Sequence, residues 1–208
     1  MSVRDDFERF KASAEAANAE VYRCAEASEA LALVAKLLRS AGVCDTPGCY
    51  ALWARCELLG ESERSALRPR VPGLRFDVDR STAELARVGV SQMDYAIADT
   101  GTLVQDATAA EQRLVSTLPD VHIALCYTDG LVADLPSLLE RGLGRDAQPV
   151  LGATGDGAGA PSPRHPAGSY WAMITGPSRT ADIERVLTIG AHGPRRLLVV
   201  FVDRAEEP

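Results

Sequence analysis

The sequence has very few lysines and no run of basic residues, which argues against a nucleic-acid-binding surface. Only Lys11 and Lys36 are lysines among 22 basic residues, and 29 acidic residues bring the formal net charge to −7. Such a chain offers no basic stripe for a phosphate backbone. It also lacks any apolar run near the roughly 18 residues of a membrane span, and its acidic amino terminus lacks the regions of a signal peptide. We therefore expect a soluble, cytoplasmic protein that binds no nucleic acid and does not insert into a membrane.

The cysteines lack the spacing of a metal site. Four residues separate Cys44 from Cys49 and six separate Cys49 from Cys56, which matches neither the C-x2-C runs of ferredoxins nor a usual zinc knuckle. Cys24 and Cys126 lie in apolar, strand-like segments. We predict no metal site and no cofactor in this chain, and we expect the thiols to behave as small buried side chains in a reducing compartment.

The pattern that is present alternates between helical and strand periods, which is typical of a layered α/β fold. A length of 208 residues with 46% apolar composition suits one domain spanning 1–208. We expect a helical amino-terminal segment over about 5–41, and a mobile loop over the Gly- and Pro-rich stretch 152–168. Capping boxes are predicted at Ser81 with Glu84 and at Thr108 with Glu111. The expected central strands are Ala19 to Cys24, Cys49 to Ala54, Leu74 to Val78, Val121 to Tyr127 and Leu197 to Val202.

Central strands without polar alternation indicate burial on both faces, as in a parallel sheet covered by helices. We therefore predict three layers, α/β/α, around a mostly parallel sheet. Ligands of such sheets bind beyond the carboxyl ends of the strands, so we expect the polar motifs that follow strands to lie together at that edge. His122 lies near the amino end of its strand and is interpreted as a buried structural histidine.

The segment ITGPSRTADIE, residues 174–184, is the most informative motif. It follows a strand-like apolar run, and Gly176 with Pro177 breaks the pattern before a predicted helix that begins at Ser178. Free amides at such a helix start attract anions, and Arg179 adds a planar donor fork. We predict that Gly176, Ser178, Arg179 and Thr180 bind a carboxylate or a phosphate, although an ordinary corner that binds nothing has the same residues.

Two further motifs carry polar groups at strand ends. The run Asp99-Thr100-Gly101-Thr102 follows a short apolar strand, and it offers a carboxylate, two hydroxyls and a glycine that permits close approach to a ligand. A turn between two strands requires the same residue types. His192, between two glycines, is the best candidate for proton transfer, with a surface histidine after a C-capping glycine as the alternative. We predict catalytic roles for Asp99 and His192, and ligand contacts for Thr100, Gly101 and Thr102.

Four ordered motifs give the chain a specific resemblance: IADTGTLV, EQRLVSTLPDVHIALC, ITGPSRTADIE and GAHGP. In this order they resemble the LUD-domain family, and within it the lactate-utilisation protein C group. The specific part of the resemblance runs from about Gly89 to Val202. It implies the NagB/RpiA/CoA-transferase-like type of α/β fold.

The family resemblance also implies a pathway, because its members act with iron-sulfur subunits that together oxidise L-lactate to pyruvate. We therefore expect this chain to be a component of that system, to have iron-sulfur lactate-utilisation subunits as partners, and to bind a small anionic ligand at the carboxyl edge of the sheet. One alternative is a stand-alone enzyme of the acyl-transfer or isomerase type, which the fold allows. The other is a non-catalytic scaffold subunit.

Overall fold

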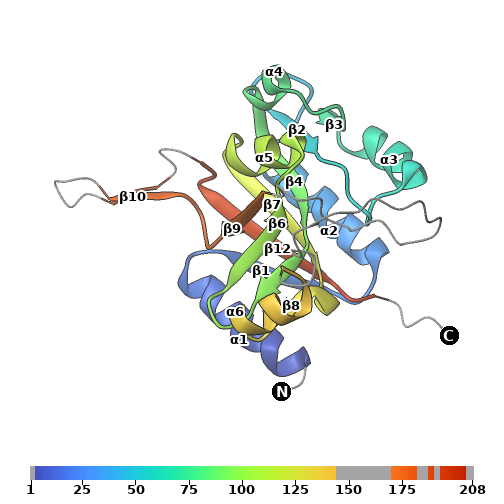
Figure 1. Ribbon diagram of the computed structural model, residues 1–208. Helices are drawn as coiled ribbons and strands as arrows, with labels where there is room; N and C mark the ends of the chain where they lie inside the picture. The colour runs from blue at the N-terminus through green and yellow to red at the C-terminus, as the bar shows by residue number, and fades with distance from the viewer. Residues whose placement is uncertain (1–2, 144–169, 182–186, 190–192, 205–208) are drawn as a thin grey trace, which may run out of the picture.

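The computed structural model describes residues 3–143, 170–181, 187–189 and 193–204. Its centre is a six-stranded sheet in which every pair of neighbouring strands is parallel, in the order β1-β12-β7-β4-β2-β3. This confirms the predicted α/β class with a parallel central sheet (Figure 1). The six strands are β1 (Glu20–Cys24), β2 (Tyr50–Trp53), β3 (Leu74–Arg75), β4 (Ala86–Met93), β7 (Val121–Tyr127) and β12 (Arg196–Val202).

The central sheet is buried on both faces because its strands carry apolar side chains at odd and even positions alike. On one face, Val90, Ile123 and Val200 join the core formed with α2 (Ala27–Ser40). On the other, Phe201 meets the rings of Phe7 and Phe10 from α1 (Val3–Ala16), edge to face, with ring centroids 5.5 and 5.0 Å apart. Figure 1 shows α1 and α2 on opposite sides of the sheet.

A second, smaller sheet covers part of the α1 face of the central sheet, and the sequence did not predict it. Its order is β8-β5-β6-β9, and both β5-β6 and β6-β9 are antiparallel. Ala96 and Leu103 of this sheet pack into the same core as Phe10. Its strands are β5 (Tyr95–Ile97), β6 (Thr102–Asp106), β8 (Leu131–Val132) and β9 (Trp171–Ile174).

Short helices complete the layers. The helix α5 (Ala110–Thr117) packs Val115 against β2, and α6 (Leu135–Leu138) packs Leu138 against the outer face of the second sheet. The others are α3 (Glu61–Leu67), α4 (Arg80–Ala83), the 3₁₀ turns η1 (Arg68–Arg70) and η2 (Thr128–Gly130), and the π-helical η3 (Leu139–Leu143). The strands β10 (Arg179–Ala181) and β11 (Leu187–Ile189) form an antiparallel pair and complete the described elements.

Both predicted capping boxes are wrong. The box at α4 is formed by Asp79, whose carboxylate accepts the N–H of Thr82 at 2.8 Å. The Thr82 hydroxyl in turn accepts the backbone N–H of Asp79. Ala109 is the residue before α5, and it has no side chain that can cap the helix. In both places the helix begins one or two residues away from the predicted start, so the predicted serine and threonine do not occupy the capping position.

Candidate functional site

The predicted Asp99 corner is the turn of a hairpin that joins β5 to β6. Gly101 has a φ of 64°, and a Cβ placed on it would lie 2.4 Å from the backbone nitrogen of Ala14 in α1. A side chain at this position would therefore collide with α1. The glycine serves close packing of the turn on a helix of the same chain.

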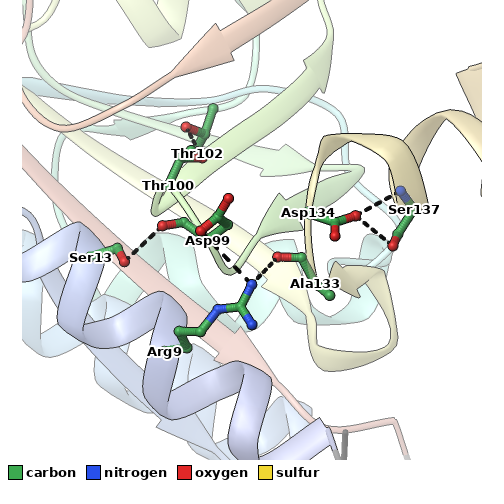
Figure 2. A network of polar contacts seen from close by, with 8 residues as sticks. All are labelled: Arg9, Ser13, Asp99, Thr100, Thr102, Ala133, Asp134 and Ser137. Atoms are coloured by element: carbon green, nitrogen blue, oxygen red, sulfur yellow. Dashed lines mark hydrogen bonds and ion pairs between the residues drawn. The ribbon is translucent and has the colours of Figure 1, made fainter.

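The polar groups of this turn contact α1 and the segment after β8. Arg9 donates a hydrogen bond to the carbonyl oxygen of Ala133 at 2.7 Å, and its guanidinium lies 4.0 Å from the Asp99 carboxylate. The hydroxyl of Ser13 donates to the backbone carbonyl of Asp99 at 3.1 Å. Figure 2 shows how these side chains of α1 reach the turn. Because the Asp99 side chain is 63% exposed, its ion pair with Arg9 is worth little.

The predicted helix at Ser178 is wrong, because the chain forms a strand there. Residues 179–181 are β10 and pair antiparallel with β11. The backbone N–H of Ser178 donates to the carbonyl of Pro194 at 2.8 Å, so the cap that was predicted to attract an anion does not form. The Arg179 guanidinium instead donates to the carbonyl oxygen of Ala17 at 2.7 Å, just after the end of α1.

The predicted motifs nevertheless come together. The Thr102 hydroxyl lies 2.7 Å from the Thr175 hydroxyl and accepts a hydrogen bond of 2.7 Å from Thr100, so the motif IADTGTLV contacts the motif ITGPSRTADIE. The motif GAHGP approaches through Gly193, where an added Cβ would lie 3.1 Å from the Cβ of Ser178. His192 and the side chain of Thr180 lie outside the described residues.

The position of this cluster differs from the prediction. Pro194, which accepts the Ser178 amide, precedes β12, and the next residue, Arg195, donates its N–H to Asp120, which precedes β7. The Ser178 end of the cluster therefore lies beside the amino ends of the central strands and not at the carboxyl edge, where the motifs were predicted to meet. The reason is that β5, β6 and β9 form a separate antiparallel sheet, which carries their turns away from the carboxyl edge.

A hollow of about 440 Å³ does lie at the carboxyl edge of the central sheet. Four separate segments line it: the residues after β2, the end of β4, the end of β6 and the start of α5. We call it the edge hollow. Its lining is Arg55, Cys56, Glu57, Gln92, Asp94, Asp106, Ala109, Glu111 and Gln112.

Glutamine side chains fix the wall of the edge hollow. The buried Gln105 donates from Nε2 to the side-chain oxygen of Gln112 at 3.0 Å and to the backbone carbonyl of Gln92 at 3.3 Å. Gln112 in turn donates to the carbonyl of Arg55 at 2.9 Å. The Gln92 side chain accepts the N–H of Glu57 at 2.8 Å. This network holds the segment after β2 at a fixed place against α5 and β4.

A second hollow of about 420 Å³ shares two of these lining residues, Arg55 and Glu111. We call it the side hollow. Arg64 lines it with its guanidinium 5.3 Å from the centre of the Phe76 ring, and the buried Nε of Arg64 has no hydrogen-bond partner in the described part of the chain. The remaining lining residues are Asp77, Val78 and Asp79. Hydrogen bonds from Ser81 and Thr82 lower the pKa of Asp79, which keeps this carboxylate ionised.

The sequence did not single out Arg55, Arg64 or Gln92 as functional. Arg55 follows a predicted central strand, and Gln92 lies at the carboxyl end of the central strand β4. Ligands of parallel sheets bind at such strand ends, so this position could have identified both residues as candidates. Arg64 lies in a short helix and carried no such signal. Glu111 and Gln112 were part of a family motif, and Glu111 was predicted to cap a helix, but neither was predicted to contact a ligand.

No helix in residues 3–143 or in the later described segments is long and apolar enough to cross a membrane. Within the same segments, no three histidine, cysteine or acidic side chains are placed to hold a metal ion together.

Comparison with known proteins identifies relatives. A Lactate utilization protein C from Shouchella clausii is 34% identical over 121 residues, which cover 58% of this chain and 46% of that protein. The Uncharacterized protein YkgG from Escherichia coli is 29% identical over 186 residues, 87% of this chain and 73% of its own length. The chain thus spans about half the length of the first of these relatives.

The fold is also similar to that of a solved structure. The crystal structure of a DUF162 family protein from Deinococcus radiodurans matches with a TM-score of 0.59 and covers 97% of this chain and 99% of its own, at 18% identity. At that identity the likeness shows the fold alone. The LUD domain model matches residues 7–202, which is nearly the whole sequence. The chain belongs to the LUD domain family.

Proposed function

We propose that this chain is a component of an L-lactate utilisation system and binds a small carboxylate at the carboxyl edge of its central sheet. Membership of the LUD domain family and relatives named Lactate utilization protein C support the pathway. Because the chain spans only about half of those relatives, their whole activity comes to it as part of this proposal. Arg55, shared by the edge hollow and the side hollow, is the observation that supports the ligand site.

The arginines suit an anionic group. A guanidinium can hold a carboxylate through two parallel hydrogen bonds, and Arg55 is exposed to both hollows. The buried Nε of Arg64 adds a donor that has no partner within the described residues. In the proposal a ligand carboxylate lies between these two side chains.

Acidic and amide groups nearby suit a hydroxyl next to the carboxylate. Glu111 lines both hollows together with Arg55, and a carboxylate can accept a hydrogen bond from a hydroxyl. Gln112 lies beside it and is held by Gln105. A 2-hydroxy acid such as L-lactate carries both groups. We propose that Glu111 accepts the hydroxyl proton as the C2–H bond of the ligand breaks and the carbonyl forms. The two electrons would pass to iron-sulfur partner subunits, and the C2 proton would leave to solvent.

The cluster predicted from the sequence remains a second candidate for the ligand site. Thr102 and Arg179 lie there with Asp99, and His192 follows in the same motif set, although the described contacts of Arg179 are with α1. In this version Arg179 would leave the Ala17 carbonyl to pair with the anion, while Asp99 or His192 would move the proton. The edge hollow is favoured because Arg55 lines an open space.

The two sites are distinguished by titrating L-lactate into purified protein and measuring binding by calorimetry. We expect Arg55→Ala to weaken binding more than tenfold, and Arg179→Ala to leave it nearly unchanged. Arg87→Ala is the matched control, because Arg87 is an exposed arginine near the amino end of β4 and far from the lining residues. Weakening by Arg179→Ala alone would transfer the site to the sequence-predicted cluster. Equal binding by all variants would discard both.

The pathway is tested separately by L-lactate-dependent dye reduction in cells that also express the iron-sulfur subunits. We expect activity to disappear without this chain and to return with wild-type protein but not with Arg55→Ala. Full restoration by Arg55→Ala would favour a scaffold subunit. Unchanged activity without the chain would favour a stand-alone enzyme of the same fold.

A further inference from the structure

Cys44 and Cys49 lie at the two ends of one tight turn. The backbone N–H of Cys44 donates to the carbonyl oxygen of Cys49 at 3.1 Å, and the N–H of Cys49 donates to the carbonyl of Thr46 at 3.0 Å. The side chain of Cys49 also makes a hydrogen bond with the Cys44 thiol. A disulfide requires two cysteine side chains that approach each other, and this turn brings these two together.

The turn is held in place by its surroundings. A Cβ on Gly73 would lie 2.2 Å from the carbonyl oxygen of Cys44, so that backbone is packed closely against the chain before β3. Asp45 accepts a hydrogen bond from Arg75 at 3.3 Å, and the N–H of Gly48 donates to Leu85 at 3.0 Å. The two cysteines therefore meet in a fixed geometry.

Cys44 is the thiol most open to reagents. It is exposed, whereas Cys49 and Cys56 are half-buried and Cys24 and Cys126 are buried. The expectation of small buried side chains therefore holds for Cys24 and Cys126 and is wrong for Cys44. The sulfur of Cys44 lies 3.1 Å from the Thr46 hydroxyl.

The surroundings of Cys44 favour its thiolate. Hydrogen bonds from the Thr46 hydroxyl and from the Cys49 thiol lower the pKa of Cys44, while the nearby charge of Asp45 opposes them. Cys56 is the opposite case, because burial raises the pKa of its thiol. A thiolate that is accessible and has a second cysteine beside it is the arrangement of oxidation-sensing thiols.

We propose that Cys44 and Cys49 form a peroxide-reactive dithiol, in which Cys44 reacts first and Cys49 closes a reversible disulfide. The Cys44 thiolate attacks one oxygen of hydrogen peroxide, the O–O bond breaks, and hydroxide leaves the Cys44 sulfenic acid behind. The Cys49 thiol then attacks the Cys44 sulfur, the S–S bond forms, the S–O bond breaks, and water leaves. The two thiols lose two electrons to one peroxide, which becomes two waters, and a small-molecule thiol reduces the disulfide again.

This site is separate from the proposed ligand site. Cys49 immediately precedes β2 at its amino end, whereas Arg55 follows β2 at the carboxyl edge. Reactivity of the dithiol and binding in the edge hollow can therefore be measured independently.

The test treats the folded full chain with hydrogen peroxide, blocks the remaining thiols with iodoacetamide, and maps the peptides by mass spectrometry. We expect a Cys44–Cys49 linkage, loss of two alkylatable thiols, and recovery of both after dithiothreitol. Cys49→Ser should stop at the sulfenic acid, which dimedone traps on Cys44, and Cys44→Ser should leave Cys49 unreacted. Cys56→Ser is the matched control and should still form the linkage. Alkylation of Cys44 and Cys49 to the same extent with and without peroxide would overturn the proposal.

A second measurement requires no cysteine variant. The rate of iodoacetamide reaction at Cys44 is followed against pH in wild-type protein and in Thr46→Val. We expect the midpoint in wild-type protein to lie below that of an ordinary thiol, and the variant to move it upward because the thiolate loses one donor. An ordinary wild-type midpoint that Thr46→Val does not move would contradict the proposed activation of Cys44.

Discussion

The Nε2 atom of His122 lies 2.8 Å from the hydroxyl oxygen of Ser91, inside the central sheet between the neighbouring strands β7 and β4. His122 is fully buried, and its Nδ1 atom has no hydrogen-bond partner in the described part of the chain. Burial without a charged partner disfavours the imidazolium and lowers the pKa of His122 from 6.5 to about 4. The imidazole is therefore neutral in the folded protein across the physiological range.

The burial of His122 predicts a loss of stability in mild acid. The unfolded chain binds a proton at His122 near pH 6.5 and the folded chain only near pH 4, so the free energy of unfolding falls as the pH drops through that window. The full contribution is about 3 kcal/mol. Urea unfolding at pH 7 and pH 4.5 measures it.

His122→Gln is the variant that isolates the effect, because glutamine does not titrate. It should be less stable than wild-type protein at pH 7, yet lose less stability between pH 7 and pH 4.5. The carboxylates with lowered pKa values, Asp79 and Asp134, titrate below this window. An equal loss in the variant and in wild-type protein would show that other groups cause the acid sensitivity.

The central sheet was predictable from sequence because its strands are apolar at consecutive positions. The run from Val121 to Tyr127 has no polar interruption except His122, and it is β7 with the bounds that were expected. Side chains at odd and even positions enter different cores, which is why the pattern shows no alternation. Burial on both faces is a property of the strand itself, so a local pattern is enough.

The second sheet was not predictable in the same way. Its strand β5 has three residues and β8 has two, and β9 follows β6 by more than sixty positions of sequence. Such short strands are stabilised by pairing with distant segments, and a local pattern holds no information about that pairing. The helix predicted at Ser178 failed for the same reason, since residues 179–181 pair with residues 187–189.

The glycine of the first hairpin should be intolerant of a side chain. Gly101→Ala forces a non-glycine residue to a φ of 64° and places its Cβ 2.4 Å from the backbone of Ala14. We expect a loss of about 2–4 kcal/mol in the free energy of unfolding. Chemical denaturation of the purified variant measures it.

Gly42→Ala is the matched control for that change. Gly42 has a similar φ of 78°, but an added Cβ meets nothing within 4 Å. We expect its free energy of unfolding to fall by only about 1–2 kcal/mol, the cost of the left-handed backbone conformation for alanine. Equal losses in the two variants would mean that contact between the hairpin turn and α1 does not limit residue 101.

The helix α4 allows a test between the cap predicted from the sequence and the cap in the structure. Asp79→Ala removes the acceptor for the Thr82 amide and should lower the free energy of unfolding by about 1 kcal/mol. Glu84, which sequence reasoning placed in the cap, makes an exposed pair with Arg80 at 2.9 Å. Glu84→Ala should therefore change stability by less than about 0.5 kcal/mol. The reverse order in urea unfolding would restore the cap predicted from the sequence.

The proposed ligand site was only partly predictable because its residues come from four segments. Glu111 and Gln112 lie in a motif that sequence reasoning recognised, but Arg55 follows β2 after a single residue and carries no local signature. What joins these residues is the parallel order of β2 beside β4, which a single sequence does not specify. The hydroxyl cluster around Thr102 was foreseen as a meeting of motifs, and its place beside the amino ends was not.

Gln105 should link stability to the shape of the edge hollow. Its buried amide donates to Gln112 at 3.0 Å and to the carbonyl of Gln92 at 3.3 Å, and both acceptors belong to residues that line the hollow. Gln105→Leu keeps similar bulk but leaves those acceptors without their donor, so we expect a loss of about 1–3 kcal/mol in the free energy of unfolding. Gln112 would also lose the contact that orients it, and L-lactate binding should weaken several-fold under native conditions. Urea unfolding and calorimetry of one preparation separate the two effects, with Gln112→Leu as the comparison because its side chain is only half-buried. Wild-type stability in Gln105→Leu would mean that this glutamine network does not hold the wall.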